Sequence, residues 1–129
     1  MIGLFLVTHG TLGEALIQCV CHVLDKRPPL LGQLGLSAAE DPADALPLAR
    51  RMIATVDEGE GVLLLADLYG ATPCNVATRL IEPGRVELVA GVNLPMLLRL
   101  LTHREGDLET LIRRAVSGAG DGVTRVQPG

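Results

Sequence analysis

The sequence predicts a layered α/β domain in which a mainly parallel sheet of four strands carries helices on both faces. Four short apolar runs recur along the 129 residues, and a helical pattern follows each of them. The runs alternate little between apolar and polar residues, which indicates strands buried on both faces, as in a parallel sheet. Their spacing of roughly thirty residues is that of a strand–helix–strand unit.

The predicted strands differ in strength. They cover Ile2 to Val7, Leu30 to Leu36, Val62 to Ala66 and Val86 to Ala90. The second is the weakest, because Gly32 and Gly35 interrupt its apolar run.

Apolar residues at helical spacing predict five helices. The expected segments are a stripe from Leu12 to Val23, about Asp44 to Val56, Pro73 to before Pro83, Leu94 to about Leu101, and Asp107 to Val116. In the second helix we expect Asp44 as the N-cap, which leaves Pro47 in a first turn that tolerates proline. Pro73 suits a first helical position.

The end of the chain has weaker signals. Residues 118–122 are rich in glycine and predict a flexible link, and Val123 to Val126 predict either an edge strand or a disordered tail. No repeat or composition change divides the chain. We therefore expect a single domain over residues 1–129, with 118–129 as its link and possible edge strand or tail.

Composition argues against several classes of function. The net charge is −4, aromatic residues are 2% of the chain, and no basic run exceeds two residues, so we expect no nucleic-acid binding. The apolar runs are shorter than the ~20 residues of a membrane helix. Three cysteines, an odd number, indicate reduced thiols in a cytoplasmic protein. The Cys19 to His22 stretch lacks metal-ligand spacing, and we expect no metal.

The candidate site lies where three predicted strands end. His9 follows the first strand, Asp67 the third and Asn93 the fourth. The carboxyl ends of strands in a doubly wound sheet meet along one edge. If the first and third strands are neighbours, Asp67 can hydrogen-bond to His9, hold one imidazole nitrogen protonated and leave the other as a nucleophile.

The groups around His9 favour an anion. Thr72 can donate its hydroxyl to an anion on the histidine, and backbone N–H groups of Gly10, Thr11 and Leu12 open a helix towards the same space. Helix N-termini attract phosphate. The set fits phosphoryl capture better than proton transfer alone, although each residue by itself also suits a surface, turn or capping role.

Three stretches carry a family resemblance: Ile2 to Gly10, Gly61 to Asn75 and Val89 to Met96. In order and spacing they resemble the IIA domain of the mannose family (mannose, fructose and sorbose type) of the bacterial phosphoenolpyruvate-dependent sugar phosphotransferase system. The resemblance covers nearly the whole chain. It implies that His9 accepts a phosphoryl group from the phosphocarrier HPr and passes it to a IIB domain, without a cofactor.

The same resemblance implies roles for other parts of the chain. Asp67 would orient His9, and Thr72 would contact the phosphoryl group. The fold would be doubly wound and the protein a homodimer, with Val123 to Val126 as an antiparallel edge strand exchanged between subunits. The protein would associate with the membrane only indirectly, through transporter components.

A relay site must be exposed to protein partners, so we expect an apolar docking surface around His9. Its candidates are Leu12, Leu68, Tyr69, Asn93, Leu94 and Met96. Three alternatives remain open from the sequence: a stand-alone regulatory phosphorylation sensor, a phosphoryl donor subunit for a dihydroxyacetone kinase, and a flavodoxin-like binding module without chemistry.

Overall fold

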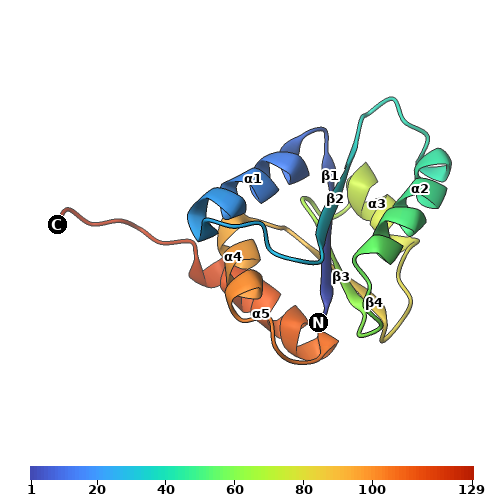
Figure 1. Ribbon diagram of the computed structural model, residues 1–129. Helices are drawn as coiled ribbons and strands as arrows, with labels where there is room; N and C mark the ends of the chain where they lie inside the picture. Colours follow the sequence, from blue (N-terminus) through green and yellow to red (C-terminus); the bar gives the residue numbers. More distant parts are fainter.

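The computed structural model describes residues 1–129 and has a four-stranded sheet at its centre (Figure 1). The strands are β1 (Gly3–His9), β2 (Leu31–Leu36), β3 (Val62–Ala66) and β4 (Val86–Ala90). Their order is β2-β1-β3-β4, and every neighbouring pair is parallel. The predicted fold class is confirmed, and each strand lies within two residues of its predicted bounds.

Helices cover both faces of this sheet. One layer holds α1 (Leu12–Leu24), α4 (Leu94–Thr102) and α5 (Leu108–Asp121), and the other holds α2 (Pro42–Thr55) and α3 (Thr72–Thr78) (Figure 1). Side chains alternate along β1, so Leu4 and Leu6 pack in the cluster with α1, α4 and α5, whereas Phe5 and Val7 pack in the cluster with α2 and α3. No helix is both long and apolar enough to cross a bilayer.

Helix α2 begins earlier than predicted. Its N-cap is Asp41, whose side chain accepts from the Ala43 N–H at 2.9 Å, and not Asp44. Pro42 takes the first helical position, where the missing N–H costs nothing. Pro47 therefore lies inside the helix. Because proline has no N–H, the Ala43 carbonyl loses its hydrogen-bond partner in the helix. Both residues are exposed.

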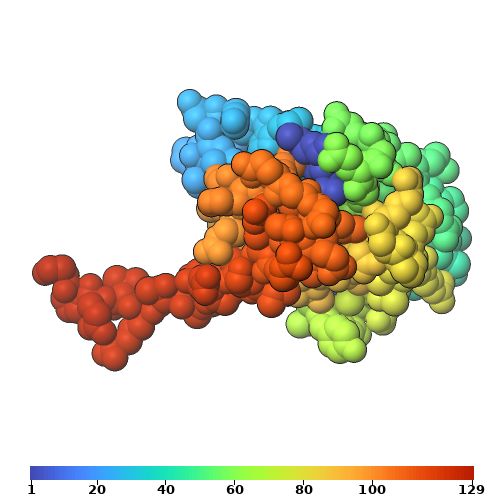
Figure 2. Space-filling view, turned by 90° about the horizontal axis from the view of Figure 1, so that it is seen from below, coloured from blue at the N-terminus to red at the C-terminus, as the bar shows by residue number.

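The C-terminal prediction also needs correction. Residues 118–121, expected as a flexible link, form the last turn of α5. Gly118 is buried there, and a Cβ on it would lie 2.9 Å from the Arg99 Cβ, so glycine allows α5 to approach α4 closely. Within a single chain Val123 to Val126 pair with no strand, and the segment extends away from the body (Figure 2).

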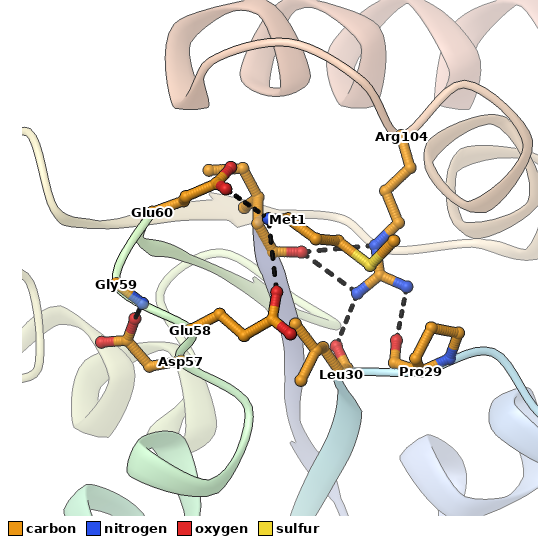
Figure 3. Close-up of polar contacts among 9 residues, drawn as sticks. Met1, Pro29, Leu30, Asp57, Glu58, Gly59, Glu60 and Arg104 are labelled. Carbon is orange, nitrogen blue, oxygen red and sulfur yellow. Dashed lines mark hydrogen bonds and ion pairs between the residues drawn. The ribbon is translucent and has the colours of Figure 1, made fainter.

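A buried arginine fastens the amino-terminal edge of the sheet. Arg104, in the turn between α4 and α5, donates from Nη2 to the carbonyls of Ile2 at 3.1 Å and Leu30 at 2.7 Å, and from Nη1 to that of Pro29 (Figure 3). Ile2 and Leu30 immediately precede β1 and β2. The guanidinium thus joins the starts of both strands to the helix layer.

Replacing Arg104 by methionine is expected to lower the free energy of unfolding by about 2–4 kcal/mol, because three carbonyls lose a charged donor. Urea denaturation followed by circular dichroism measures the change. Arg113→Met is the matched control, since Arg113 is exposed and its side chain bonds only to Thr110. Equal losses in the two variants would contradict a structural role for the Arg104 contacts.

Candidate functional site

The strand order brings His9 and Asp67 together at the carboxyl edge of the sheet. β1 and β3 are the two central strands, with Val7 paired to Ala66. His9 ends β1, and Asp67 directly follows β3. From β1 the chain crosses to β2 on one side, and from β3 to β4 on the other. This reversal is the topological switch point at which open α/β sheets bind their ligands.

Asp67 contacts His9 at two atoms. Its Oδ2 lies 2.8 Å from the ring Nδ1 and accepts the backbone N–H of His9 at 3.0 Å. An ionised carboxylate can only accept, so Nδ1 carries the proton and Nε2 carries the free lone pair. The His9 side chain is 52% exposed, whereas that of Asp67 is 9% exposed. The geometry therefore holds a nucleophilic imidazole where a partner can reach it.

The Asp67 carboxyl remains ionised despite its burial. Burial by itself raises its pKa, but the hydrogen bonds from the His9 backbone and ring outweigh that effect, and the pKa of Asp67 lies below its usual value. Its second oxygen, Oδ1, is buried without a hydrogen-bond partner. The negative charge is thus directed at His9, where it can stabilise a positive charge on the ring.

The turn after His9 is held from two sides. The Gly10 N–H donates to the Leu36 carbonyl at 2.9 Å, and the buried Thr8 hydroxyl accepts the Gly13 N–H at 2.8 Å. A Cβ on Gly35 would lie 1.9 Å from the Gly10 carbonyl oxygen, so only glycine allows β2 to lie so close to this turn. These contacts limit the movement of the segment that follows His9.

The same contacts correct one predicted role. We expected the N–H of Gly10 to bind a phosphoryl group, but it is already donated to β2. The N–H groups of Thr11 and Leu12, at the start of α1, have no acceptor within the chain. The predicted set of amide donors at the N-terminus of α1 is therefore reduced to these two.

Thr72 is the first residue of α3, on the segment that follows Asp67. Its side chain is exposed and its hydroxyl makes no hydrogen bond, and Ala71 is the residue at the N-cap position. The alternative that Thr72 serves only to cap the helix is thus not supported. Cys74, two residues further on, is buried in the core, as expected for an apolar filler.

The predicted docking residues fall into two groups. Leu12, Leu68 and Tyr69 are exposed, and Tyr69 reaches 85% exposure. Met96 is 1% exposed and packs in the core beneath α4, so its prediction as a docking residue is wrong. Asn93 accepts the Met96 N–H and donates to the Ala119 carbonyl, which ties α4 to α5. Leu94, next to it, is half-buried.

A metal site is not formed by these residues. No group of three or more His, Cys, Asp or Glu side chains is placed to hold a metal ion. His22, beside Cys21 on α1, is exposed and makes no side-chain hydrogen bond.

Comparison with known proteins identifies the family of this chain. The model of the EIIA-man family, described as the PTS system fructose IIA component, matches residues 3–116. The chain belongs to this family. The resemblance to a mannose-family IIA domain, which rests on the three stretches around His9, Asp67 and Asn93, is thereby confirmed.

Individual relatives of this IIA domain come from several bacteria. It is 30% identical over 125 residues, 95% of the chain, to the mannose-specific EIIAB component of Escherichia coli, and spans 38% of that protein's length. It is 47% identical over 51 residues to the fructose-specific EIIA component of Bacillus subtilis, which covers 39% of the chain and 35% of that protein.

Solved structures show the same fold. The mannose/sorbose specific IIA subunit of Enterococcus faecalis superposes with a TM-score of 0.87 at 22% identity, covering 99% of this chain and 96% of that one. A component EIIA from Streptococcus agalactiae gives a TM-score of 0.84 at 20% identity, covering 97% of both chains. At this identity the likeness concerns the fold.

The Asp67 contact predicts a pH-dependent contribution to stability. The pKa of Asp67 is lower in the folded protein than its ordinary value of 3.8, so the ionised carboxylate stabilises the fold above that value. This contribution is lost as the pH falls through the folded-state pKa. The gap in unfolding free energy between wild type and Asp67→Asn should therefore shrink as the pH falls from about 5 to about 2 in urea titrations.

The control for that experiment is Asp25→Asn. Asp25 is exposed, its side chain has no hydrogen-bond partner, and its left-handed backbone (φ 55°) also suits asparagine. Its gap to wild type measures the effect of removing one exposed carboxyl that no side chain contacts. A gap for Asp67→Asn that stayed constant across the range would show that the His9 contacts do not favour the ionised form.

Gly35→Ala tests the fastening of the His9 turn. The added methyl meets the Gly10 carbonyl, so β2 and the turn must separate, at an expected cost of about 1–3 kcal/mol in unfolding free energy. Two-dimensional NMR should show shifts of the His9 and Gly10 amides. Gly120→Ala, with open space around the residue in α5, should leave both signals unchanged and raise the unfolding free energy by no more than about 1 kcal/mol. Unmoved His9 signals in Gly35→Ala would refute the close approach.

Proposed function

We propose that this IIA component is a cytoplasmic phosphocarrier in which His9 accepts a phosphoryl group from phospho-HPr and passes it to a IIB component during sugar uptake. The observation that supports it most is the 2.8 Å contact of the His9 ring Nδ1 with the buried Asp67 at the carboxyl edge of the central strands. This contact leaves Nε2 unprotonated on a half-exposed ring.

In the proposed transfer, the Nε2 lone pair attacks phosphorus and an N–P bond forms on His9. The bond from phosphorus to the donor histidine of HPr breaks, and its electron pair stays on that donor nitrogen. Positive charge develops on the His9 ring, and the ionised Asp67 stabilises it through the Nδ1 proton. The onward step is the reverse process with a nucleophile of the IIB component as acceptor.

The phosphoryl oxygens need donors, because the transition state of phosphoryl transfer is loose and positioning dominates catalysis. We assign this role to the N–H groups of Thr11 and Leu12, which lack acceptors at the start of α1, and to the free hydroxyl of Thr72. The positive end of the α1 dipole adds to the attraction for the phosphoryl group.

Transfer between two proteins also needs a docking surface. Leu12, Leu68 and Tyr69 are exposed near the candidate nucleophile, and apolar side chains of this kind suit a short-lived interface. The relatives named as mannose-specific EIIAB components are longer proteins, which supports a IIB component as acceptor for this chain. We also propose a homodimer in which the extended segment Val123 to Val126 reaches the partner chain.

Intact-mass analysis after incubation with phosphoenolpyruvate, Enzyme I and HPr tests the relay. Wild type should gain one acid-labile phosphoryl group, about 80 Da. His9→Ala should gain none, and Asp67→Asn should be labelled roughly 100-fold more slowly because the ring is no longer oriented. His22→Ala, which removes an exposed histidine of α1, should label like wild type.

Labelling of His9→Ala would contradict the assignment of the nucleophile. An unlabelled wild type, beside a control IIA domain labelled by the same mixture, would contradict the relay itself. Adding a purified IIB component separates transport from regulation, because a relay loses its label to IIB whereas a regulatory sensor retains it.

A further inference from the structure

A cavity of about 520 Å³ lies on the side of the molecule away from His9, between the end of α2 and the connection from α3 to β4. Figure 2 shows this end, where the yellow α3–β4 connection lies beside the green segment that follows α2. The apolar part of the wall includes Ile53, Leu80 and Val86. This volume is within the range of about 300–1,000 Å³ of small-molecule sites.

Three arginines line the cavity, and only one of them is paired. Arg85 uses Nη2 to contact Asp57 at 2.6 Å and Nε to donate to Glu82 at 3.2 Å. Asp57 and Glu82 are the only two acidic residues in the lining, and Arg85 pairs with both of them. Arg50 and Arg79 make no ion pair and no side-chain hydrogen bond.

The cavity is therefore electropositive in an acidic protein. The whole chain has 15 acidic and 11 basic residues, yet the cavity lining has one more basic than acidic residue. The two free guanidinium groups come from different elements, Arg50 from α2 and Arg79 from the end of α3. An anion between them would be bound from two directions.

We propose that this cavity binds a small organic phosphate, with the phosphate on Arg50 and Arg79 and the carbon skeleton against Ile53, Leu80 and Val86. A phosphate monoester has a charge near −2 and three acceptor oxygens, which match two guanidinium groups. A monocarboxylate offers a single charge and two acceptor oxygens, and is therefore the weaker match to two guanidinium groups. The site is independent of the relay at His9, because neither its residues nor its edge of the sheet are shared.

The test is an NMR titration of the ¹⁵N-labelled full chain with glycerol 3-phosphate in about 150 mM NaCl, where nonspecific surface attraction is screened. Saturable shifts are expected for the amides of residues 79–82 and for Arg50, with a Kd between about 10 µM and 1 mM. Arg50→Gln and Arg79→Gln should each weaken binding at least about tenfold. Arg51→Gln, which removes the same charge from the next position of α2, should not.

Several outcomes would overturn the proposal. These are no saturation up to about 10 mM, shifts centred on the His9 turn in place of the cavity, or an equal loss of affinity in Arg51→Gln. Inorganic phosphate, succinate and glycerol are titrated alongside. Weaker binding of all three supports recognition of both the phosphate and the carbon skeleton, whereas equal binding of succinate refutes the assignment to phosphate.

Discussion

The pairing of β1 with β3 is the interaction on which the rest of this structure depends. Both strands are buried on both faces, and each supplies side chains to the two separate core clusters. A slip of one residue in their register would exchange the faces that Leu4 and Phe5 occupy and disrupt both clusters. The same register places the end of β1 beside the end of β3, so the burial that stabilises the sheet also brings His9 next to Asp67.

At the candidate site, a buried carboxylate, Asp67, orients an exposed imidazole, His9. Asp67 accepts both the backbone and the ring of His9 on one oxygen, which constrains the direction of the imidazole without covering it. Thr8 and Gly35 hold the following turn from the α1 and β2 sides. In the proposed relay, protein partners require access to the ring, and Asp67, Thr8 and Gly35 leave the ring uncovered because they constrain it from beneath and beside it.

The arginines at the opposite edge of the sheet divide by environment. Arg104 is buried and directs most of its donors to the carbonyls of Ile2, Pro29 and Leu30. Arg50 and Arg79 are exposed, and their donors are free beside a cavity whose wall is only partly apolar. A guanidinium stabilises the fold in the first case and is available for recognition in the second, although the residue type is the same.

Local patterns in the sequence were sufficient for the four strands and the α/β class, because apolar runs and turn residues act over a few positions. They placed His9 and Asp67 at strand ends, and the order β2-β1-β3-β4 made those ends neighbours. The same patterns misplaced the N-cap of α2 at Asp44, and they suggested that Met96 was exposed and that the Gly10 N–H was free. Tertiary structure decided those points, since burial and hydrogen-bond partners come from distant segments. Arg104 shows the reason most clearly: it lies 102 residues from Ile2, so no local pattern could reveal that their contact closes the edge of the sheet.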